Sequence, residues 1–220
     1  MTSKYESFKP VLSDSDDSDE DGVEFDFEKL GPIDISPSEH KLQHTYCLWY
    51  GKKGSAKLRA QEYGRSIHFI GRIATVEQWW SLYCYLIRPT VLKPYRILHL
   101  FKSGIKPMWE DAANARGGKW IVRLRKNKVD RAWENVCMAM LGEQFLVGQE
   151  ICGVAISSQY PEDHLSVWNR TASDQSSTAR IRDTLRRILN LPPTNPMEYK
   201  PHYDTTKSAK AAPTPVAKSS

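Results

Sequence analysis

Short segments rich in β-branched and aromatic residues recur along this chain, and no other feature restricts its fold as strongly. Six such segments lie at residues 44–50, 65–74, 97–102, 119–125, 151–159 and 164–171. In most of them apolar side chains alternate with other types, which is the period of a β-strand. KWIVRLR at 119–125 is the clearest case, because Trp120, Val122 and Leu124 fall on one face and the basic residues on the other. We therefore expect a chain built largely from strands.

Three further segments have the spacing of amphipathic helices. The first covers residues 76–87 and follows Thr75, a predicted N-cap, with Gln78 completing a capping box. The second covers residues 128–141, and the third starts at Ser173 and ends before Pro192. Because strands and helices do not alternate regularly, we expect an α+β fold in which one antiparallel sheet is backed by three helices.

The two ends of the chain lack the pattern of a folded domain. Residues 1–38 include the run SDSDDSDEDG, and residues 208–220 are small, polar and proline-bearing. Neither segment can bury enough apolar surface to order itself, so we expect a disordered acidic arm and a flexible tail. Residues 39–207 are expected to form a single domain, since 220 residues with 40% hydrophobic content suit one core.

Charge is distributed unevenly between the arm and the body. Residues 1–38 hold 11 acidic and 3 basic residues, a net charge of −8; since the whole chain carries +5, the remainder carries +13. A basic body with seven tryptophans suits a nucleotide or RNA partner, because cations attract phosphates and aromatic rings stack on bases.

Several classes of protein are not expected. The chain has no signal-like start and no run of about 18 apolar residues, so we expect neither secretion nor a membrane span, and we place it in the cytoplasm. Its four cysteines form no C-x-x-C pair and have no compact spacing, so neither a metal site nor a cofactor is expected.

The segment KPMWEDAANARGGKW at 106–120 combines two tryptophans with an acidic pair. Its GGK does not complete a phosphate loop, because Ala113 and Trp120 stand where that motif requires glycine and serine or threonine. The acidic pairs at 110–111 and 162–163 lack a nucleophile or a third ligand, so no catalytic residue is expected. Trp109 and Glu110 are then either core and turn residues or a stacking face beside a carboxylate.

The binding interpretation accounts for more of these residues. Guanine alkylated at N7 is a delocalised cation that stacks on aromatic rings, and one carboxylate can accept both hydrogen bonds from its N1 and N2 edge. Trp109 and Glu110 supply the ring and the carboxylate, and Lys119 and Arg123 supply cations for phosphates. Asp111 is expected to fix the loop rather than to touch the ligand.

The exposed surfaces of two predicted helices each allow two interpretations, one structural and one as a binding surface. The predicted helix at 76–87 carries Trp79 and Leu82 on one flank and Val76 and Trp80 on the other, more than packing on a sheet requires. Either a long loop covers the excess or a helix of a partner docks there. The arginines of residues 180–187 are either a solvated face or a contact with RNA.

Seven segments follow one another in a recognisable order and spacing: KLQHTYCLWY, VEQWW, LFKSGIKPMWEDAANARGGKW, MLGEQF, EICGVAIS, SVWNRTASD and LNLPP. They resemble the messenger-RNA cap-binding translation initiation factor 4E family. Within it the chain is most similar to the 4E homologous protein, the class of cap-binding translational repressors, because of Tyr46, Tyr63 and the segment TASDQSSTARIRDTLRRILNLPP. The resemblance implies a single curved antiparallel sheet of about eight strands backed by three helices.

The resemblance also implies a binding site for the 7-methylguanosine cap. Tyr63 and Trp109 would enclose the base, Glu110 would bind its Watson–Crick edge, and Trp168 would contact the methyl group. The residues placed toward the phosphates are Lys119, Arg123, Gln159, His164 and Lys207. Gln159 and His164 stand where the family has cations, and tyrosine is a weaker π face than tryptophan, so weaker cap binding than that of the initiation factor is expected.

A partner surface is implied on the convex face. Val76, Trp80 and Met138 match positions that bind a helix with a Tyr-x-x-x-x-Leu-apolar motif, and His40 and Leu42 would add contacts at the first strand. Lys41 replaces a proline there, a departure from the family's pattern.

The expected function is non-enzymatic. A monomer would bind capped mRNA, occupy the cap and recruit a partner, and so repress translation. The alternative within the family is a productive initiation factor that recruits the initiation scaffold, and the alternative from another class is a cap-processing hydrolase.

Overall fold

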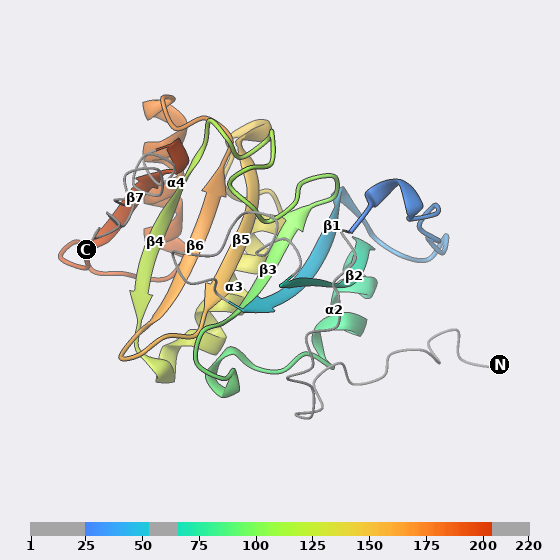
Figure 1. Ribbon diagram of the computed structural model, residues 1–220, viewed down its shortest axis with the longest axis horizontal. Helices are drawn as coiled ribbons and strands as arrows, with labels where there is room; N and C mark the ends of the chain where they lie inside the picture. Colours follow the sequence, from blue (N-terminus) through green and yellow to red (C-terminus); the bar gives the residue numbers. More distant parts are fainter. Residues whose placement is uncertain (1–24, 53–65, 204–220) are drawn as a thin grey trace, which may run out of the picture.

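A computed structural model describes residues 25–52 and 66–203. In this part of the chain seven antiparallel strands form one curved sheet, in the order β2-β1-β3-β5-β6-β4-β7, which Figure 1 shows from right to left. The strands are β1 Lys41–Lys52, β2 Ile67–Thr75, β3 Arg96–Lys102, β4 Gly118–Leu124, β5 Ile151–Ser157, β6 Asp163–Asn169 and β7 Met197–Pro201. The antiparallel α+β fold is thus confirmed, and six of the strands match predicted segments.

Three α-helices pack on one face of the sheet: α2 Val76–Tyr83, α3 Val129–Leu141 and α4 Gln175–Ile188. Figure 1 shows α3 crossing behind the strands. The predicted cap of α2 is confirmed, since Gln78 N donates to Thr75 Oγ1 at 3.1 Å. The helix ends at Tyr83, with Cys84 as its C-cap, rather than at Ile87 as predicted. Helix α4 is capped by Asp174, which accepts from Ser177 N at 3.0 Å, rather than by Ser173.

The main core lies between the sheet and the helices. Trp79 of α2 and Trp133 of α3 are fully buried there, against strand residues such as Leu48, Leu100 and Val122. Within the described ranges no helix is long and apolar enough to cross a membrane. The opposite face, which we call the open face, carries the alternate side chains of the same strands.

The strand register fixes which residues meet on the open face. One row of directly paired residues runs Cys47, Phe101, Gly153, Trp168, Lys119, Lys200 across six strands. A second row runs Gly51, Ile97, Ser157, His164, Arg123. Residues far apart in the sequence are thereby lined up on one surface.

Part of the predicted N-terminal arm lies within the described residues and contacts the open face. Phe25 stacks on Phe69 with ring centroids 4.5 Å apart and meets the edge of Trp49 at 4.6 Å, and Phe27 packs beside it. Further along, Gln78 Nε2 donates to Asp34 O at 2.9 Å. Residues 25–38 are therefore packed where the sequence predicted an arm; residues 1–24 and the tail at 208–220 lie outside the described residues.

Gly153 leaves room for the ring of Phe101 on the neighbouring strand. An ideal Cβ at Gly153 would overlap that ring, and Phe101 is itself fully buried at 5.4 Å from Trp168. We expect Gly153→Ala to lower the free energy of unfolding by about 2 kcal/mol, because forced overpacking costs about 1–3 kcal/mol. Urea unfolding measures the change. Gly31→Ala, where nothing lies within 4 Å, is the control, and equal stability of the two variants would contradict the prediction.

Candidate functional site

The loop between β3 and β4 presents Trp109 and Glu110 at the edge of the open face. Two polar side chains hold it in shape. Asp111 accepts from Lys106 N and from Ala113 N, each at 2.9 Å, and the fully buried Asn114 donates to Lys106 O at 2.9 Å and Met108 O at 2.7 Å. Asp111 therefore fixes the loop, as predicted, and both of its oxygens are occupied in doing so.

Trp109 is half-buried and Glu110 is exposed. Partial burial raises the pKa of Glu110, and a hydrogen bond from the Trp109 side chain opposes that rise. The arrangement offers a stacking surface and a hydrogen-bond acceptor from adjacent residues.

Lys119 and Trp168 are direct partners across β4 and β6. The Lys119 Nζ atom lies 4.7 Å from the centroid of the Trp168 ring, within the range of a cation–π contact. Trp168 is only 6% exposed, because Phe101 packs on its edge and His202 lies with its ring centroid 4.4 Å away. Its indole N–H donates to Ser166 Oγ at 3.3 Å, which fixes the ring.

Arg123 and His164 form the next pair on the same two strands. The Arg123 side chain is exposed and lies 3.7 Å from Glu198 of β7, an ion pair open to solvent. Gln159 follows β5 and donates from its side chain to Ser157 Oγ at 3.4 Å. Arg123, His164 and Gln159 thus lie toward the same end of β4, β5 and β6.

The structure places four predicted site residues on paired strands and leaves two undescribed. Lys119, Arg123, His164 and Trp168 meet on β4 and β6, while Trp109, Glu110 and Gln159 lie in the segments that follow β3 and β5. Tyr63 and Lys207 fall outside the described residues. Sequence reasoning did not single out Phe101 or His202, which support Trp168, because only the strand register places them there.

Two buried histidines beside this site, His99 and His202, are in the neutral form. Burial and the nearby charge of Lys119 lower the pKa of His202 to about 3, and the same causes lower the pKa of His99 to about 3. Both rings therefore pack as uncharged aromatic groups at neutral pH. In the part of the chain that the structure describes, no three histidine, cysteine or carboxylate side chains gather to hold a metal ion.

The predicted partner surface lies on the other side of the sheet. Trp79 is fully buried, whereas Trp80 is 41% exposed, and Met138 of α3 is 37% exposed. Val76 is half-buried and its N–H donates to His40 O at 2.9 Å, which joins the start of β1 to α2. Leu86 and Ile87 pack against the main core, whereas Trp80 and Met138 stay exposed. The described residues therefore cover only part of the excess apolar surface. Leu42 is half-buried beside them in the main core.

A family model described as eukaryotic initiation factor 4E matches residues 41–215. The chain belongs to the eukaryotic initiation factor 4E family. It is 44% identical over 170 residues to eukaryotic translation initiation factor 4E-4 of Caenorhabditis elegans, covering 77% of this chain and 80% of that protein. It is 40% identical over 185 residues to eukaryotic translation initiation factor NCBP of Oryza sativa subsp. japonica, covering 84% and 81%.

Solved structures of initiation factor 4E proteins share the fold. C. elegans eIF4E-3, in complex with the 4E-binding protein Mextli and a cap analog, superimposes with a TM-score of 0.71 at 34% identity, covering 77% of this chain and 96% of that one. Ascaris suum eIF4E-3 with an m7G cap gives a TM-score of 0.68 at 35% identity, covering 74% and 92%. Both comparisons agree with the single curved sheet described above.

The buried His99 generates a prediction about pH. His99 is 1% exposed, neither of its ring nitrogens has a hydrogen-bond partner among the described residues, and its pKa is lowered from 6.5 to about 3. Between these values the unfolded chain binds a proton that the folded chain does not, so stability is complete above about pH 6.5 and is lost as the pH falls toward 3. The contribution of one such group is about 1.4 kcal/mol per pH unit.

We expect the unfolding free energy of His99→Leu to fall less steeply with decreasing pH than that of the natural protein. The difference in slope should be about 1.4 kcal/mol per pH unit between about pH 6.5 and pH 3. Denaturant unfolding at a series of pH values measures both proteins. Parallel curves for the two would contradict a neutral buried His99.

Proposed function

We propose that this protein binds the 7-methylguanosine 5′ cap of mRNA and represses translation. The observation that carries the proposal is the register of β4 with β6. It sets Lys119 opposite Trp168 and Arg123 opposite His164 on one surface, beside the loop that holds Trp109 and Glu110. An aromatic ring, a carboxylate and two cations in this order match a charged base followed by phosphates.

The base is recognised by its charge and by its hydrogen-bonding edge. Methylation at N7 makes guanine a cation, which stacks on Trp109 more strongly than neutral guanine does. Tyr63 provides the second ring of the sandwich. The exposed carboxylate of Glu110 accepts from N1–H and N2–H, and the charge strengthens both hydrogen bonds. Trp168 contributes its edge toward the methyl group.

The phosphates are held by fewer cations than in the initiation factor. Lys119 and Arg123 extend from alternate positions of β4 on the open face, and Lys207 adds a third cation from the C-terminal segment. Gln159 and His164 occupy positions that the resemblance assigns to cations, so two charge-assisted hydrogen bonds are lost there at neutral pH. Weak cap binding with a retained partner surface suits a protein that acts on selected messages.

The partner surface supports a role through recruitment. Trp80 of α2 and Met138 of α3 are exposed apolar side chains, and a hydrogen bond from Val76 N to His40 O joins α2 to the start of β1. We assign this surface to the helix of a protein with a Tyr-x-x-x-x-Leu-apolar motif. In this proposal the protein acts as a cytoplasmic monomer whose domain spans residues 39–207, and the recruited partner supplies message selection and repression.

Cap recognition is tested by titration with methylated and unmethylated guanine cap analogues. We expect tighter binding of the methylated analogue, since only its ring is charged. Glu110→Gln should weaken it on the order of 10- to 100-fold, because hydrogen bonds to charged groups contribute about 1.5–3 kcal/mol. Asp183→Asn on α4, which removes one exposed carboxylate elsewhere, is the matched control.

The weaker binding is tested in the same titration with Tyr63→Trp and Gln159→Arg. Each should tighten binding of the methylated analogue, by a better π face and by an added phosphate cation respectively. If neither variant binds the methylated analogue more tightly, the explanation of weak binding is wrong. Equal affinity for the two analogues in the natural protein would overturn the assignment of the cap as ligand.

The recruited partner is tested by pull-down with two motif peptides, one from the initiation scaffold and one from a translational repressor. We expect the repressor peptide to bind and Trp80→Ala to weaken it at least about 30-fold, since a central interface tryptophan contributes about 2 kcal/mol or more. Tyr160→Ala, another exposed aromatic side chain, is the control. Preferential capture of the scaffold peptide would instead establish a productive initiation factor.

A further inference from the structure

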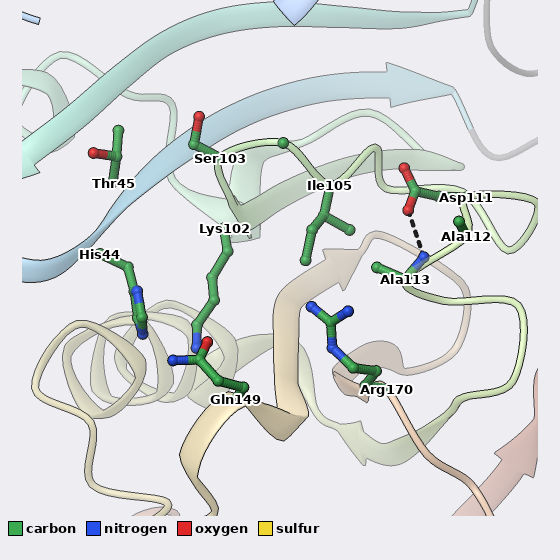
Figure 2. Close-up of a pocket in the computed structure, with 11 residues that line it drawn as sticks. His44, Thr45, Lys102, Ser103, Ile105, Asp111, Ala112, Ala113, Gln149 and Arg170 are labelled. Carbon is green, nitrogen blue, oxygen red and sulfur yellow. Dashed lines mark hydrogen bonds between the residues drawn. The ribbon is translucent and has the colours of Figure 1, made fainter.

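A second pocket lies beside the loop that carries Trp109 and Glu110, and its volume is about 640 Å³. Lys102 ends β3 on the same strand face as Leu98 and Leu100 of the main core, whereas the lining residues Ile105 and Ala113 pack with Phe101 and Trp168 of the open face. The pocket therefore lies at the end of β3, between the two faces of the sheet. Its polar lining consists mainly of His44, Lys102, Asp111, Gln149 and Arg170. Figure 2 shows these side chains approaching from different walls. None of them belongs to the predicted cap or partner sites.

Lys102 is the unusual group in this pocket. It is only 6% exposed, and its Nζ atom has no hydrogen-bond partner among the described residues. Burial lowers the pKa of Lys102, while the nearby Glu143 carboxylate opposes that change. An ammonium removed from water without a partner is strongly unfavourable, so a fold that retains one needs a compensating interaction.

The neighbouring carboxylates already have other partners. Asp111 accepts from the backbone of its own loop, and Glu150 accepts from Thr171 N at 2.9 Å and from its hydroxyl at 3.0 Å. Glu143 Oε1 accepts from the Tyr46 hydroxyl at 2.8 Å and lies 3.7 Å from His44. Of these acids only Asp111 lines the pocket, and none of the three forms a hydrogen bond with Lys102.

A second cation faces Lys102 across the pocket. Arg170 follows β6, is exposed, and extends its guanidinium toward the interior in Figure 2. No ion pair joins it to a carboxylate within residues 25–52 and 66–203. His44 and the exposed Gln149 add polar groups beside the two cations, and desolvation lowers the pKa of His44, which favours its neutral form.

We propose that this pocket binds a phosphate group between the Lys102 ammonium and the Arg170 guanidinium. Arginine accommodates two oxygens of a phosphate in its planar fork, and the flexible stem of lysine lets Nζ turn to a third. His44 and Gln149 donate further hydrogen bonds. The pocket is larger than a phosphate ion, so it also accommodates the group to which a phosphate monoester is attached.

Residue-resolved NMR of the full chain tests the proposal, with inorganic phosphate and phosphoserine as probes and chloride as the background anion. We expect saturable shifts centred on Ala112, Ala113 and Arg170. Lys102→Met and Arg170→Gln should each weaken binding at least about tenfold, since each removes a charge-assisted contact. Arg123→Gln, which removes a cation from the open face, is the matched control and should leave these shifts unchanged.

Thermal unfolding gives a second readout. A ligand that binds only the folded protein raises its midpoint, so phosphate should stabilise the natural chain and not Lys102→Met. Without ligand, Lys102→Met should be at least as stable as the natural chain, because the unpaired charge is gone. Tighter binding of phosphoserine than of inorganic phosphate would identify a protein-borne phosphate as the source, whereas equal binding would identify a free anion.

The proposal would be overturned by NMR shifts confined to Lys119 and Arg123. It would also be overturned if phosphate had equal effects on the natural chain and on Lys102→Met. These outcomes are independent of cap recognition, because the readout is the pocket itself.

Discussion

The pairing of β4 with β6 is the constraint on which the open face depends. Side chains alternate between the two faces of a strand, so a shift of β4 by one residue would move Lys119 and Arg123 to the helix side and away from Trp168 of β6. The register is fixed from the other face, where Val122, Leu165 and Val167 are fully buried in the main core. Apolar packing behind the sheet therefore determines which polar groups meet in front of it.

The sheet also separates two kinds of surface. On the helix side, neighbouring residues of α2 have opposite environments, since Trp79 is fully buried and Trp80 is exposed. On the open side, a small second cluster of Phe101, Ile105, Cys152 and Trp168 supports the cations of β4. The predicted cap-binding residues and the predicted partner surface therefore lie on opposite sides of the sheet, with no side chain in common.

Most of the fold could be predicted from local patterns. Alternation identified six strands, and the Thr75 cap identified the start of α2, because both signals lie within a few residues. Strand β7 was missed because MEYKP is short, lacks β-branched residues and ends in proline. Residues 25–38 fall in the predicted arm because that prediction rests on the acidic run at 13–22, whereas Phe25 and Phe27 pack beside Trp49 and Phe69.

The candidate site was predictable only in part. Its residue types could be read from the sequence, as for Lys119 and Arg123 on one face of β4. The support of Trp168 by Phe101 and His202 depends on pairing between distant strands, which a single sequence does not reveal. Lys102 gave no signal either, since a lysine at the end of a strand is ordinarily solvated; its burial follows from the packing of the surrounding loops.

The distribution of the seven tryptophans has an optical consequence. Trp49, Trp79 and Trp133 are at most 2% exposed and lie among apolar neighbours, so they emit a constant, blue-shifted background. Trp109 lies on the rim of the open face, and Trp80 is exposed on the helical face. Trp168 lies on the open face as well, so replacing Trp80 with phenylalanine removes the exposed indole of the helical face and keeps both Trp109 and Trp168. Changes at the open face can then be followed by intrinsic fluorescence, without any attached dye.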